Sequence, residues 1–103
     1  MAYATAMDAL GDATRREIME RLRGGPRPVG EIAAGLLISR PAVSQHLRVL
    51  REAGLVTERK EGTRRIYRVE PKALADLRAY LDSFWEQALA SYRTAAESEG
   101  SKG

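Results

Sequence analysis

The sequence predicts a mainly α-helical domain that carries one small β-hairpin. Apolar residues recur at helical spacing through most of the 103-residue chain, and two β-rich runs are joined by a short connection that contains glycine. The chain has no cysteine, which excludes a disulfide scaffold, a thiolate metal site and thiol catalysis. We expect a single domain over residues 1–97 and a disordered tail over residues 98–103.

Three helices are expected before the centre of the chain. A short N-terminal helix has Tyr3 and Met7 one turn apart on the same face. A second helix follows Asp12, a suitable N-cap, and stops at the Gly-Gly-Pro break that ends at Pro26. A third helix begins at Pro28 and is amphipathic.

The fourth helix has the clearest boundaries. Ser39 is a strong N-cap, Pro41 fits the first turn, and Gly54 is the expected left-handed terminator. Its apolar positions form the stripe of a helix that packs on one side only: Val43, Leu47 and Leu50.

A hairpin and a long helix complete the chain. Residues 55–60 and 64–70 read as two strands around Glu-Gly-Thr, and Pro71 starts the last helix. The predicted order is therefore α-α-α-α-β-β-α, with five helices. A helix pair followed by a hairpin is the order of a winged helix-turn-helix.

The charge is unevenly distributed along the chain. The net charge is +3, and 14 of the 17 basic residues are arginine. Residues 1–39 are neutral, residues 40–69 carry +5 and residues 70–99 carry −3. A strongly basic segment favours a polyanionic partner, because each neutralised phosphate releases condensed counterions. A solvated basic face without a partner is the alternative.

The basic segment has the chemistry of a DNA-reading surface. With the apolar stripe of the fourth helix facing the core, the opposite side carries arginine, which pairs with guanine, and glutamine, which pairs with adenine. Cations at the hairpin would contact phosphates. We predict these DNA-binding residues: Ser39, Arg40, Pro41, Ser44, Gln45, His46, Arg48, Arg59, Lys60, Thr63, Arg64 and Arg65. His46 lies beside the apolar stripe, and packing or hydrogen bonding is its alternative role.

The stretch PVGEIAAGLLISRPAVSQHLRVLREAGLVTERKEGTRRIYRV resembles the DNA-binding core of the ArsR family of bacterial transcriptional repressors. The preceding DATRREIMERL resembles the helix before that core, so the likeness covers about residues 8–70. The resemblance implies a homodimeric repressor that binds an imperfect inverted repeat in double-stranded DNA.

The sensor sites of metal-responsive ArsR proteins are not matched. Pro28 and Gly30 stand where a Cys-x-Cys pair is familiar, and the last helix carries carboxylates but no histidine. The resemblance therefore favours the metal-free autorepressor branch, with no cofactor. Thiol redox sensing is excluded by the lack of cysteine.

The last helix has a broader apolar face than one small domain can cover, and a symmetric dimer would bury it. Folding back onto its own core is the alternative. The predicted dimer interface combines Tyr3 and Met7 of the first helix with eight residues of the last helix. These eight are Leu74, Leu77, Leu81, Phe84, Trp85, Ala88, Leu89 and Tyr92.

The sequence predicts a cytoplasmic, homodimeric, sequence-specific repressor. No apolar run approaches the ~20 residues of a membrane span, and the start of the chain lacks a secretory signal. An enzyme is not expected, because no nucleophile–base pair or phosphate-binding glycine loop is present. Two alternatives remain: a winged-helix protein-interaction module, and a repressor that responds to a small molecule bound at the dimer interface.

Overall fold

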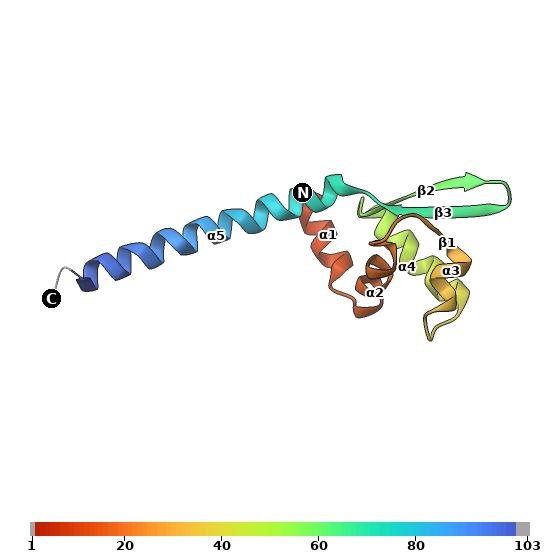
Figure 1. Cartoon of the computed structure of the whole chain (residues 1–103), viewed down its shortest axis with the longest axis horizontal. Helices are drawn as coiled ribbons and strands as arrows, with labels where there is room; N and C mark the ends of the chain where they lie inside the picture. The colour runs from red at the N-terminus through yellow and green to blue at the C-terminus, as the bar shows by residue number, and fades with distance from the viewer. Residues whose placement is uncertain (1, 101–103) are drawn as a thin grey trace.

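The computed structural model describes residues 2–100 and shows, within them, five helices and a three-stranded antiparallel sheet (Figure 1). This is the winged helix-turn-helix arrangement that the sequence predicts. The elements in chain order are α1 (Ala2–Leu10), α2 (Ala13–Leu22), β1 (Arg27–Pro28), α3 (Val29–Ala34), α4 (Arg40–Glu52), β2 (Val56–Glu61), β3 (Arg64–Val69) and α5 (Pro71–Gly100).

The ends of α2 and α4 are set by the residues that the sequence indicated. The Asp12 carboxylate accepts a hydrogen bond from the backbone N–H of Arg15 at 3.0 Å. The Ser39 hydroxyl accepts one from Ala42 at 3.3 Å. Gly54 ends α4 with φ at +77°, and the next N–H returns to the carbonyl of Leu50 at 2.9 Å. This backbone pattern is a Schellman motif, so the start of β2 is fixed relative to α4.

The core lies where α4 crosses α2 and α3. The predicted stripe on α4 is fully buried against apolar residues of these helices and of the sheet. The largest fully buried side chains are Ile18, Leu22, Ile32, Val43, Leu47, Leu50, Leu55 and Val56.

The sheet has one more strand than the sequence predicts. Strand β1 pairs with β3 through only two residues, Arg27 opposite Tyr67 and Pro28 opposite Ile66. A two-residue strand carries no period, and proline at a sheet edge gives no β signal, so the pairing was invisible in the sequence. The strand order is β1-β3-β2. Strands β2 and β3 form the wing, with Gly62 in its turn at φ +64°.

Helix α5 projects from the body of the domain (Figure 1). The molecule measures 70 × 25 × 22 Å because of this helix. Its first turns pack beside α1, where the ring of Tyr3 stacks on Tyr80 with 4.2 Å between centroids. Leu74 packs against the chain's own core.

The C-terminal end of α5 differs from the expected tail. Residues 98–100 continue the helix, because Ala95, Ala96 and Glu97 are strong helix formers and extending a helix needs no new nucleus. The remaining positions of the predicted tail, residues 101–103, lie outside the described residues. No helix within residues 2–100 is long and apolar enough to span a membrane.

Candidate nucleic-acid interface

The side of α4 opposite its buried stripe forms an exposed polar surface. Arg40, Ser44, Gln45 and Arg48 are all exposed and lie on this side, as predicted from their helical spacing. We call these four residues the recognition face. Because the buried stripe fixes the rotation of α4 about its axis, the recognition face is held outward by the core itself.

The wing divides its cations between its two faces. Lys60 lies opposite Arg65 in the register of β2 and β3, whereas Arg59 lies opposite Ile66 and Arg64 opposite Glu61. Since side chains alternate along a strand, Lys60 and Arg65 share one face, and Arg59 and Arg64 share the other. The face of Arg65 is the one turned towards α4, because Arg65 lines a groove with α4 residues.

Two hollows join the recognition face to the wing. The first, of about 480 Å³, brings Ser44, Gln45 and Arg48 together with Arg65. The second, of about 530 Å³, brings Arg40 together with the wing-tip residues and the start of α3. The wing-tip residues in the second hollow are Thr63, Arg64 and Arg65. The structure thus assembles most of the predicted residues into one continuous basic surface.

Three of the predicted DNA-binding residues make contacts within the protein itself. His46 is partly buried and turned towards α2, where its Nδ1 lies 3.5 Å from Nη1 of Arg15. Ser39 caps α4. Arg59 pairs with Glu61 on the wing face away from α4. A role in DNA binding for these three stays a prediction.

Glu58 organises a cluster that the sequence analysis did not include. Its Oε1 lies 2.6 Å from Nη1 of Arg51 and 3.3 Å from Nη1 of Arg65. Tyr67, its partner across the wing, donates its hydroxyl to the same carboxylate. This bond, followed by the charges of Arg51 and Arg65, lowers the pKa of Glu58, while burial and Glu58 raise the pKa of Tyr67. Arg51 and Tyr67 also line the groove that holds Ser44, Gln45 and Arg48.

Several basic side chains remain available for an anionic partner. Within the part of the chain that the structure describes, Arg48, Arg51, Arg59 and Arg65 have carboxylate partners. Within the same range, no ion pair involves Arg40, Lys60 or Arg64. These last three extend along the recognition helix and the wing, as a phosphate-contacting surface requires.

Replacing Glu58 by Gln should lower the free energy of unfolding at pH 7 by about 0.2–1 kcal/mol, the range of exposed ion pairs. The lowered folded-state pKa means that the carboxylate's contribution is complete above its unfolded pKa of about 4.5 and is lost as the pH falls through the folded value. The difference between wild type and variant should therefore shrink below about pH 4, as urea unfolding across a pH series would show. A difference that stays constant with pH would contradict this role, and Glu61→Gln on the exposed wing is the matched control.

The apolar face of α5 is exposed in the single chain. Leu81, Phe84, Trp85 and Tyr92 are all more than half exposed along the projecting part of the helix, with Tyr92 reaching 74%. All four belong to the predicted dimer interface, which stays a prediction. Tyr80, which the prediction omitted, connects the N-terminal helix to this face through edge-to-face contact with Phe84 at 5.1 Å.

A capped helix with an outward polar face, beside a basic β-wing, defines a winged helix-turn-helix DNA-binding domain. Residues 12–58 match the family model described as "Bacterial regulatory protein, arsR family". Together with the relatives below, this places the chain in the ArsR family of transcriptional regulators.

Two curated relatives and one solved structure illustrate the membership. HTH-type transcriptional regulator Rv2034 of Mycobacterium tuberculosis is 56% identical over 92% of this chain and 89% of its own length. Transcriptional repressor SdpR of Bacillus subtilis is 35% identical over 66% of this chain and 76% of its own. The homodimeric winged helix-turn-helix domain of Mb0332 from Mycobacterium bovis, solved by NMR, superposes with a TM-score of 0.67 at 32% identity, covering 85% of this chain and 82% of that one.

Metal-ligating side chains do not gather in the described structure. Within residues 2–100, no three His, Asp or Glu side chains lie close enough together to hold a metal ion. Asp76, Asp82 and Glu86 on α5 do not form such a group. Metal independence of the regulator stays a prediction.

Proposed function

We propose that this protein is a homodimeric transcriptional repressor that binds an inverted-repeat operator, with α4 of each protomer in a major groove and each wing on the flanking backbone. The observation that carries the proposal is the continuous surface in which Gln45 and Arg48 lie beside Arg65 in one groove. Arginine and glutamine side chains can read guanine and adenine edges, and the wing cations supply charge for phosphates.

Dimerisation is supported by the apolar face of α5 and by the homodimeric state of the related M. bovis domain. A single winged unit contacts little DNA for tight specific binding, whereas two units contact successive turns of the duplex. The second copy would bury Trp85 and Tyr92, which the single chain leaves in water.

Repression, rather than activation, is supported by the related B. subtilis repressor. We further propose that control does not depend on a soft metal, because the sequence has no cysteine and a single histidine. Autorepression is the simplest form of such control. Genomic selection of fragments bound by the purified protein, with its own promoter included, tests operator choice and autorepression together. Failure to retain any genomic fragment at physiological salt would reject the proposed function.

The two classes of DNA contact should separate by mutation. Gln45→Ala should weaken binding to the selected operator by about 1–3 kcal/mol and leave binding to scrambled duplex almost unchanged, because only a base contact is lost. Arg64→Ala should weaken both duplexes alike and reduce the log–log salt slope by about 0.9. Fluorescence anisotropy at several salt concentrations measures both effects. Equal loss on both duplexes from the Gln45 change would contradict base reading.

A protein-binding winged helix is the second candidate from the sequence. Such a module would present an apolar recognition surface to its partner, whereas the recognition face consists of arginine, serine and glutamine. The chemistry of the exposed side of α4 therefore favours DNA.

A further inference from the structure

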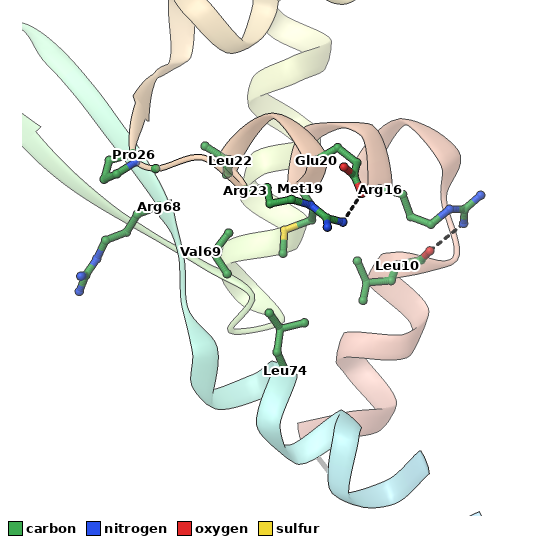
Figure 2. A pocket seen from close by; sticks show the side chains of 11 residues that line it. Leu10, Arg16, Met19, Glu20, Leu22, Arg23, Pro26, Arg68, Val69 and Leu74 are labelled. Atoms are coloured by element: carbon green, nitrogen blue, oxygen red, sulfur yellow. Dashed lines mark hydrogen bonds and ion pairs between the residues drawn. The ribbon is translucent and has the colours of Figure 1, made fainter. Parts of the chain in front are cut away.

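A large hollow lies on the domain at the junction of α1, α2, the wing and the start of α5. Figure 2 shows Met19, Val69 and Leu74 directed towards a common space, with Leu10 and Leu22 beside them. The volume is about 660 Å³, which is within the usual range of small-molecule sites. We call it the α2–α5 pocket. Its floor is apolar, so it would favour the hydrocarbon part of a ligand.

The rim of the α2–α5 pocket is cationic. Arg16, Arg23 and Arg68 line it with a single carboxylate, that of Glu20. Glu20 pairs with Arg23 at 2.5 Å, whereas Arg16 donates to the carbonyl of Leu10 and Arg68 to the hydroxyl of Thr57. In the region that the structure describes, Arg16 and Arg68 thus have no carboxylate partner. Figure 2 places these two at opposite ends of the pocket with their guanidinium groups directed outwards, and Arg23 between them near Met19.

The pocket is distinct from both surfaces described above. None of the recognition-face residues lines it, and Leu74 is its only residue from the predicted dimer interface. It does contact the wing at its root, because Arg68 and Val69 belong to β3, the strand that carries Arg65 to the DNA-facing groove. A ligand there would touch α2 and β3 at once, so it could alter the position of the wing relative to α4.

We propose that the α2–α5 pocket binds an amphipathic organic anion, a carboxylate with an apolar chain or ring, and that binding changes the affinity of the protein for DNA. The apolar part occupies the floor formed by Met19, Val69 and Leu74, and the carboxylate meets the rim arginines. Binding is independent of the proposed function, whereas the effect on DNA rests on it. This site differs from the ligand pocket at the dimer interface that the sequence suggested as an alternative.

Methionine methyl NMR on the full chain tests binding, with octanoate as the probe and 1-octanol as the uncharged control. Met19 lies in the pocket, and Met7 is exposed on α1 outside it, so each reports a different place. The Met19 methyl signal should shift saturably with octanoate while that of Met7 stays constant. Octanol should bind about tenfold more weakly, because charge-assisted hydrogen bonds are lost.

Rim variants test the role of charge. Arg23→Gln and Arg68→Gln should each weaken octanoate binding by about three- to tenfold, whereas Arg59→Gln, on the wing outside the pocket, should not. An unshifted Met19 at millimolar octanoate, or equal binding of octanol, would overturn the site. A Met19 signal that responds only to dilution of the dimer would also overturn it, since the pocket would then be covered by the second copy.

The effect on DNA is measured separately by anisotropy with the selected operator. Operator affinity should change by at least about fivefold in saturating octanoate, a shift at the low end of allosteric coupling. Unchanged operator affinity together with a saturable Met19 shift would overturn the proposed effect on DNA binding, while the proposed binding site would stand. Absence of any DNA binding, with or without octanoate, would instead reject the proposed function, while the Met19 titration would still decide the site.

Discussion

Replacing Trp85 by Glu should convert the protein to monomers and lower its affinity for an inverted-repeat operator by at least about 100-fold. Trp85 is 64% exposed on the projecting part of α5, in the centre of the apolar face. Buried aromatic residues dominate protein interfaces, and symmetry would place two carboxylates in this one. The affinity falls because two linked half-site contacts gain a factor of roughly 10²–10⁴ over separate ones.

Sedimentation would give the mass, which should fall to that of one 11.4 kDa chain, and anisotropy would give the affinity. Ala90→Glu is the matched control, because residue 90 lies about 140° around the helix from Trp85 and is also exposed. It should leave both mass and affinity unchanged. A Trp85→Glu variant that stays dimeric would contradict the proposed interface.

Replacing Leu47 by Ala should lower the free energy of unfolding by about 2–5 kcal/mol, because it removes a fully buried side chain from the centre of the core. Leu47 lies between Val43 and Leu50 on the stripe that holds α4 against α2 and α3. The loss is a large share of the stability of a small domain. Urea unfolding at one fixed protomer concentration measures it, since dimerisation makes stability depend on concentration.

Val49→Ala provides the comparison for this change. Val49 is on the same helix but 38% exposed, so its replacement should alter stability by no more than about 0.5 kcal/mol. A similar loss for the two variants would mean that α4 is not held by its buried stripe.

The helices and the wing could be predicted because their signals are local. Asp12, Ser39 and Gly54 set helix ends through contacts within five residues along the chain, and such contacts are visible in a sequence. The recognition face followed from the same reasoning, since the stripe that is buried determines the side that is exposed.

The parts that were missed depend on contacts between distant segments. Strand β1 exists only because Arg27 meets Tyr67 across 40 positions of chain. Arg51 forms an ion pair with Glu58 of the wing, and His46 lies beside Arg15, 31 residues earlier. The alternation of strands β2 and β3 could have assigned Lys60 and Arg65 to one wing face, but the face turned towards α4 required the fold.

The projection of α5 separates two pieces of information in the proposed complex. Base preference would reside in Gln45 and Arg48 on α4, and the distance between half-sites would be set by how two copies of α5 cross near Trp85. Mutations on α4 would leave the distance between half-sites unchanged, and mutations near Trp85 would leave the base preference unchanged. The base sequence of the half-sites and the length of the spacer between them could therefore diverge independently in evolution. An engineer could change the base preference without redesigning the dimer interface, or the reverse.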